Sequence, residues 1–284
     1  MLRSELYRAF HRRWTYIAFA LGLMITVSGY IGIQLGNLSF KTAPHEFNSW
    51  YVYLQVFGMN FNSIWGVMVP LFAALPFGDT LIYDLNHGFE VPLIMRCGMK
   101  RYFFTKWLAN IIVIACVSCA VLSCSLIMAL LWRRDIKMPT IMSATDSPFS
   151  GVYLSSYQPH VLNGLFWTHP AVYSLIPIVI GVLVCISIGS ITMVASLFSK
   201  KRYLILAAPF IFYMLFNVAV QVIGLYLWVP FVMSAGFLEF QYSILPTIFY
   251  WSPILLFSWI ATHFGPNRYR EFKLALSNSS DSND

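Results

Sequence analysis

The chain has 284 residues, of which 58% are hydrophobic and only 10% are charged, and its formal net charge is +7. Soluble domains carry about a quarter charged residues, so this composition excludes an ordinary water-soluble fold. The long unbroken apolar runs favour membrane helices over barrel strands, which alternate polar and apolar residues. The basic residues lie beside apolar runs, which fits membrane topology and lipid headgroups rather than nucleic acid.

The first thirteen residues have an amphipathic pattern. Leu2, Leu6 and Phe10 recur at helical spacing, and arginines occupy the other faces. This pattern predicts an interfacial helix over 1–13 that lies in the headgroup plane of the membrane. The alternative is a positively charged flank of the first span without a helix of its own.

Six apolar runs approach or exceed the roughly 20 residues that a membrane-spanning helix needs. We therefore predict an all-α polytopic membrane protein with one six-helix transmembrane domain over 14–267. The polar tail over 268–284 is predicted to be cytoplasmic and partly disordered. The predicted spans cover residues 14–35, 60–77, 107–132, 171–198, 203–225 and 247–264.

Lys and Arg residues cluster before the first span, between the second and third, between the fourth and fifth, and after the sixth. The cytoplasmic side carries the excess of basic residues, so this bias predicts a multi-pass protein of the cell membrane with both termini in the cytoplasm. The cluster Arg133, Arg134 and Lys137 departs from the bias because it directly follows the third span. A seventh span within 147–168 is the alternative that would change the count.

No motif for phosphate, metal or nucleophilic chemistry occurs: the chain lacks a glycine-rich phosphate-binding loop, an H-E-x-x-H pair and a G-x-S-x-G turn. We expect no catalytic residue, no metal site and no directly bound cofactor. The predicted spans hold almost no ionisable side chains, which argues against an ion-coupled secondary transporter. Asn217 and Gln221 share one face of the fifth span, which fits either a translocation path or an interhelical hydrogen bond.

The most distinctive segment joins the second and third spans. A short apolar stretch follows Pro92, which suits the start of a helical turn. Gly88 precedes this stretch and Gly98 follows it, so the sequence predicts a brief amphipathic helix between two glycine hinges. Such a helix is typical of docking into a groove of a cytoplasmic partner, and an ordinary structured loop is the alternative.

This segment and the six-span layout resemble the permease subunits of the ABC type 2 exporter family. In that family a cytoplasmic loop carries an acidic residue, a glycine, a short coupling helix, a second glycine, a basic pair and a lysine entering the third helix. The matching positions here are Asp79, Gly88, 89–96, Gly98, Lys100 with Arg101, and Lys106. Pro92 departs from the usual coupling helix.

The resemblance implies a permease without its own nucleotide-binding motif. ATP with Mg²⁺ would be bound and hydrolysed by a separate cytoplasmic ABC ATPase, expected in two copies, and a second permease copy or a paralogue would complete the assembly. The face that docks on the ATPase would be Phe89, Leu93, Ile94 and Arg96. The exported substrate would be hydrophobic or amphipathic, such as a peptide, antibiotic or lipid. The alternatives are a non-transporting membrane scaffold or sensor and, less favoured, a secondary transporter.

Overall fold

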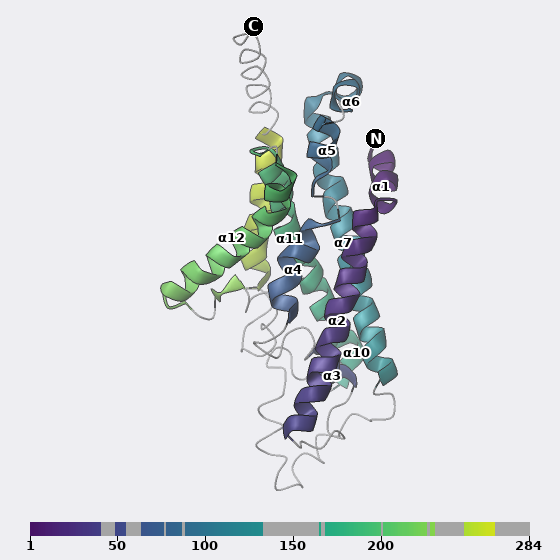
Figure 1. Cartoon of the computed structure of the whole chain (residues 1–284), viewed down its shortest axis with the longest axis vertical. Helices are drawn as coiled ribbons and strands as arrows, with labels where there is room; N and C mark the ends of the chain where they lie inside the picture. Colours follow the sequence, from purple (N-terminus) through teal and green to yellow (C-terminus); the bar gives the residue numbers. More distant parts are fainter. Residues whose placement is uncertain are drawn as a thin grey trace.

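The computed structural model describes residues 1–40, 49–54, 64–76, 78–86, 89–132, 165, 168–199, 201–225, 228–230 and 247–264. Its regular elements in these ranges are all helices, and they form an elongated bundle (Figure 1). They are α1 (Leu2–Phe10), α2 (Arg13–Phe40), α3 (Ser49–Leu54), α4 (Ile64–Ala74), α5 (Thr80–Asn86), α6 (Glu90–Cys97), α7 (Met99–Trp132), α10 (Pro170–Tyr173), α11 (Leu175–Ser196), α12 (Arg202–Val222) and a helix over 247–264.

Within the described residues, four helical segments are long and apolar enough to cross a membrane, which makes the chain a multi-pass membrane protein. They are Arg13–Gly32, Met99–Trp132, Pro170–Ser196 and Arg202–Val222, and they coincide with the predicted first, third, fourth and fifth spans. The predicted second span appears as the shorter α4, and the predicted sixth span coincides with the helix over 247–264. Neither of these two meets the same limits, so the count of six spans stays a prediction.

The third membrane helix begins earlier than the apolar run indicates. α7 starts at Met99, directly after Gly98, whose positive φ of 79° interrupts the helical backbone. The sequence interpretation began this span at 107 because Lys106 carries a charge. In the structure α7 continues through Lys106, since carboxylates from two other helices neutralise its ammonium group.

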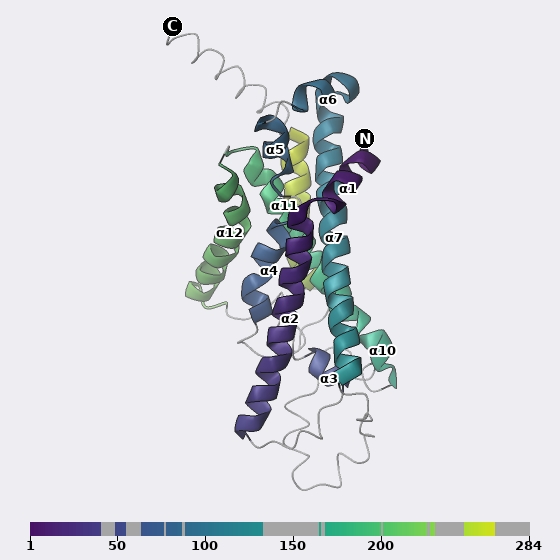
Figure 2. The same ribbon diagram turned by 45° about the vertical axis from the view of Figure 1, so that its right-hand side comes forward.

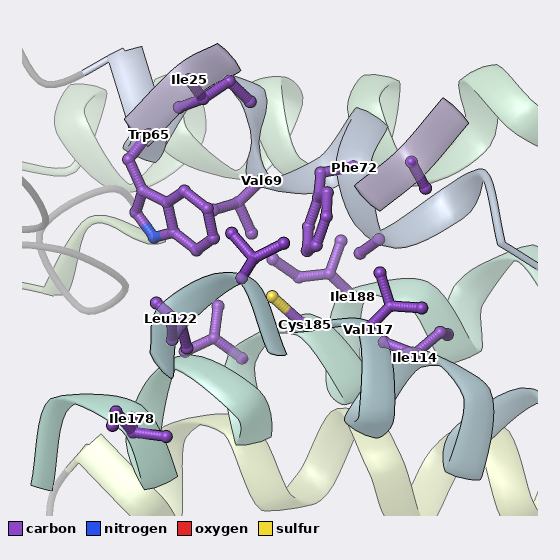
Figure 3. Close-up of a cluster of buried hydrophobic side chains, with 14 of the residues drawn as sticks. Ile25, Trp65, Val69, Phe72, Ile114, Val117, Leu122, Ile178, Cys185 and Ile188 are labelled. Carbon is purple, nitrogen blue, oxygen red and sulfur yellow. The ribbon is translucent and has the colours of Figure 1, made fainter. Parts of the chain in front are cut away.

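The centre of the bundle is α11, which packs against α7, α4 and α12. Buried side chains of α2, α4, α7 and α11 form the main hydrophobic cluster (Figure 3). The helix over 247–264 is joined to α7 by a hydrogen bond of 3.1 Å from Trp107 Nε1 to Ser258 Oγ. The residues labelled in Figure 3 are Ile25, Trp65, Val69, Phe72, Ile114, Val117, Leu122, Ile178, Cys185 and Ile188.

Part of the apolar face of α1 contacts the helix bundle. Leu2, Leu6 and Ala9 lie against the main cluster, and the helix packs on α7. The amphipathic pattern therefore predicted the helix correctly, while part of its apolar face serves as a contact with the bundle.

Several predicted features lie outside the described residues. These are the hinge at Gly88, the basic cluster Arg133, Arg134 and Lys137, most of the alternative seventh span, and the tail over 268–284.

Glycine at position 189 allows three helices to approach closely. A Cβ atom at Gly189 would lie 2.7 Å from the backbone oxygen of Ala73 and 2.5 Å from Ile114 Cδ1. At Gly32 on α2 an added Cβ would meet nothing within 4 Å. The two glycines therefore offer a matched pair for testing the packing.

We expect Gly189→Ala to destabilise the protein by about 1–3 kcal/mol, because overpacking must displace a backbone carbonyl. Gly32→Ala should be neutral or slightly stabilising, since alanine favours the helix and finds open space. Thermal unfolding of both variants in the same detergent measures the difference. Equal melting temperatures for the two variants would contradict this packing.

Candidate functional site

A group of charged side chains gathers at one end of the bundle. Both views place α1, α5 and α6 at this end, together with the start of α7 (Figures 1 and 2). The start of α12 joins them through an ion pair between Arg202 and Asp79. The charges form two adjacent clusters that connect helices distant in the sequence.

The first cluster surrounds Lys106, whose side chain is fully buried. Its Nζ lies 2.7 Å from Glu5 Oε2 and 2.6 Å from Asp84 Oδ2. Arg8 lies 3.0 Å from Glu5 Oε2 and 2.9 Å from Asp84 Oδ1. The hydroxyl of Tyr102 donates a hydrogen bond of 3.0 Å to Asp84 Oδ2. Two cations and two anions thus alternate, and each charge has a neighbour of opposite sign.

Helical spacing explains how these groups meet. Tyr102 and Lys106 are one turn apart on α7, and Glu5 and Arg8 are one turn apart on α1. Glu5 and Ala9 form the buried face of α1, so Glu5 points into the bundle rather than toward water. A carboxylate on this face is stable there because Lys106 neutralises it.

The second cluster is centred on Asp79, which is 2% exposed. Arg12 Nη1 lies 2.9 Å from Asp79 Oδ1, and Arg202 Nε lies 2.7 Å from Asp79 Oδ2. Each arginine also lies over an aromatic ring. The Cζ atom of Arg12 is 5.5 Å from the centroid of the Tyr83 ring, and the Cζ atom of Arg202 is 5.1 Å from the centroid of the Trp14 ring. One carboxylate therefore joins the α1–α2 junction to the start of α12.

The pKa of Asp84 reflects two opposing effects. Burial alone would raise this pKa, but the charges of Lys106 and Arg8 and the hydrogen bonds from them outweigh burial. The pKa of Asp84 consequently lies below its ordinary value of 3.8, and the group is ionised at neutral pH. For Arg8, burial would lower the pKa, but the hydrogen bond to Asp84 and the nearby carboxylates raise it.

The short helix α6 is attached to this charged end by its inner face. Leu93, Ile94 and Cys97 pack against a second hydrophobic cluster that includes Leu81 of α5 and Tyr102 of α7. The outer face of α6 is exposed: Pro92 and Arg96 are open to solvent, and Phe89 and Met95 are 51% and 79% exposed. The helix ends at Cys97, and the N–H of the following Gly98 donates a hydrogen bond of 2.8 Å to the carbonyl of Ile94.

The four residues predicted to dock on a partner therefore divide between two faces. Phe89 and Arg96 are exposed, whereas Leu93 and Ile94 are half-buried against the bundle. The exposed apolar groups next to Phe89 and Arg96 are Pro92 and Met95.

Asn217 and Gln221, the two polar residues predicted to share one face of α12, lie in different environments. Asn217 is 8% exposed, and its Nδ2 donates a hydrogen bond of 2.9 Å to the carbonyl of Tyr213 on the same helix. Gln221 is exposed, one turn further along the helix. The two side chains do not share one environment.

An apolar pocket of about 660 Å³ lies between α12 and the helix over 247–264. No charged side chain lines it, and five of its lining residues are aromatic. Pockets of this size and character accept apolar or ring-bearing molecules. The lining residues are Phe212, Phe216, Trp228, Phe249, Tyr250, Pro253 and Ile254.

Sequence reasoning identified Asp79 and Lys106 as parts of a motif but missed Asp84 and the other partners of these two residues. Glu5, Arg8 and Arg202 looked like ordinary residues of positively charged flanks. One signal was present at Glu5: it falls on the same helical face as Leu2, Leu6 and Ala9. A carboxylate on an apolar stripe indicates a buried cationic partner.

No family model, curated protein or solved structure matches this chain. Among the described residues, no group of three or more His, Cys, Asp and Glu side chains is placed to hold a metal ion.

We expect Lys106→Met to destabilise the protein by about 3–5 kcal/mol, because it leaves Glu5 and Asp84 buried without their central cation. Lys100→Met removes an exposed lysine from the same helix, and its effect should stay within about 0.5 kcal/mol. Thermal unfolding in detergent, with limited proteolysis of the N-terminal segment, compares the two. Similar losses in both variants would exclude a structural role for the Lys106 cluster.

Asp84 also predicts a pH dependence. Because its folded-state pKa lies below 3.8, its contribution to stability is complete above that value and is lost as the pH falls through the lower folded-state pKa. Asp84→Asn should be less stable than the wild type at neutral pH and should lose less stability on acidification. Melting temperatures measured between about pH 7 and about pH 3 test this linkage. Parallel pH profiles would show that Asp84 does not carry it.

Proposed function

We propose that this chain is the membrane-spanning permease subunit of an ATP-driven exporter of the ABC type 2 class. A separate cytoplasmic ATPase would supply the energy, and a second permease copy or a paralogue would complete the assembly. The observation that supports this proposal most is the attachment of α6: one face is fixed to the bundle, and the other presents exposed apolar side chains.

The outer face of α6 suits a protein partner. Phe89 and Met95 expose apolar surface next to the cationic Arg96, at the end of the bundle (Figure 2). An aromatic residue, a methionine and an arginine are side chains enriched in protein interfaces. The proposed docking face is therefore Phe89, Pro92, Met95 and Arg96.

The contacts of the charged end provide a route from α6 to the membrane helices. A movement of α6 would be transmitted to α5 and α7 through the hydrophobic cluster that includes Tyr102. The ion pair between Asp84 and Arg8 would transmit the movement to α1, and the ion pair between Asp79 and Arg202 would transmit it to α12. Helices linked in this way move as rigid bodies when an interface closes.

The aromatic pocket supports the substrate class. It lies beside a membrane-spanning helix and has no charged lining residue, which suits a hydrophobic or amphipathic molecule over a small ion. The N-terminus and α6 lie at one end of the bundle (Figure 1). In the proposed orientation the protein spans the cell membrane, and this end faces the cytoplasm.

The first experiment is gentle purification of the tagged chain from its native host, followed by identification of the proteins that accompany it. Recovery of a soluble protein with a nucleotide-binding domain is the expected result. Reproducible recovery of the chain without any ATPase would favour the scaffold or sensor function instead.

We expect Met95→Asp to weaken the association with the ATPase by about 30-fold, or about 2 kcal/mol, because it places a charge in an apolar contact. Met95→Leu keeps the apolar surface and should retain the association. Co-purification and substrate-stimulated ATP hydrolysis measure both variants. The melting temperatures should not change, since Met95 is 79% exposed. Unchanged association in Met95→Asp would exclude this face as the docking site.

A further inference from the structure

The described charges are distributed unequally between the interior and the surface. Every carboxylate whose side chain the structure describes is buried in an ion pair: Glu5, Asp79 and Asp84. Among the basic side chains that the structure describes, six are exposed and form no ion pair with these carboxylates: Arg3, Arg13, Arg96, Lys100, Arg101 and Lys201. The described surface at this end is therefore basic without local compensation.

Two of these basic residues lie at neighbouring helix starts. Arg13 is the first residue of α2, and Lys201 directly precedes α12. The starts of these helices are in contact, because Arg202 stacks over Trp14 at 5.1 Å. Asp79 further joins them by pairing with both Arg12 and Arg202. We call the exposed side chains that flank this contact in the sequence, Arg13, Tyr16, Lys201 and Tyr203, the α2–α12 seam.

The seam lies where two membrane-spanning segments begin, at Arg13 and at Arg202. Tyr16 follows Arg13 by one turn and is 62% exposed, while Tyr203 is 86% exposed. Tyrosines with exposed rings are enriched at the level of lipid headgroups, where an apolar ring meets a polar surface. Basic side chains at that level attract anionic lipids.

We propose that the α2–α12 seam binds the phosphate headgroup of an anionic phospholipid. The lipid would belong to the membrane leaflet at the end of the bundle where α1 lies. Arg13 would contact the phosphate with its planar guanidinium group, and Lys201 would add a second cation. The rings of Tyr16 and Tyr203 would cover the glycerol region. This site goes beyond the exporter proposal and is independent of it, because it needs neither ATP nor a partner chain.

The position of the seam favours a lipid over a protein partner. The seam lies where two membrane-spanning segments begin, whereas α6 lies further out at the same end of the bundle (Figure 2). Arg12 and Arg202 are occupied by Asp79, so they hold the two helix starts together while Arg13 and Lys201 remain open to a ligand.

The test uses the purified full-length chain in a neutral detergent and an acyl-labelled dioleoylphosphatidylglycerol, whose fluorescence anisotropy reports binding. Unlabelled dioleoylphosphatidylglycerol should displace the probe, whereas dioleoylphosphatidylcholine and inorganic phosphate should not. Equal displacement by phosphatidylcholine would overturn the preference for anionic lipid. Displacement by inorganic phosphate at the same concentration would assign the site to free phosphate rather than lipid.

The double variant Arg13→Gln with Lys201→Gln should lose about 30-fold in affinity, which corresponds to about 1 kcal/mol for each basic side chain. The matched control Lys100→Gln with Arg101→Gln removes the same charge from the start of α7 and should bind nearly as the wild type does. The exchange Arg13→Lys with Lys201→Arg keeps the charge and should retain binding, which separates headgroup contact from a folding defect. Unchanged affinity in the first variant, or an equal loss in the control, would overturn the proposal.

Discussion

The ammonium group of Lys106 determines much of the architecture at the charged end. It is fully buried within a membrane helix, where a lone charge would cost several kcal/mol. Glu5 and Asp84 reduce this cost by approaching within 2.7 Å and 2.6 Å, and each needs its own helix in place to do so. The position of α1 on the bundle and the position of α5 beside α7 are thus linked to the neutralisation of one charge. Arg8 completes the arrangement because two carboxylates against one cation would leave a net negative charge in the interior.

The two charge clusters differ in how firmly they hold their helices. Lys106 and Asp84 have no exposed side-chain surface, whereas Arg202 is 40% exposed and its pair with Asp79 is accessible to water. Exposed ion pairs contribute little to stability, since water and salt screen them. Of the four membrane-spanning segments, α12 also has the smallest share of buried residues, 28% of its most apolar stretch against 56% for the segment containing α11. It leans away from the bundle in both views (Figures 1 and 2). α12 is therefore the membrane helix best suited to move relative to the rest.

The same end presents surfaces of different chemistry. The outer face of α6 is apolar with a cationic edge, and the α2–α12 seam is basic with tyrosines. Because the described carboxylates lie in the interior, none of them neutralises the exposed basic side chains of these surfaces. The proposed protein partner and the proposed lipid headgroup would then bind at separate places, each near a helix that the charge clusters connect to the others.

The sequence by itself determined the local features. Apolar runs predicted the membrane helices, Gly98 marked the break before α7, and the last predicted span coincides with the helix over 247–264. Local periodicity and backbone conformation decide such features, and both are readable from neighbouring residues. Only the tertiary structure decided which charges meet, since Lys106 and Glu5 are 101 positions apart. It also decided that Leu93 and Ile94 turn inward, and that Asn217 is buried while Gln221 is exposed. A helical pattern defines faces, but the packing of distant helices determines which face is covered.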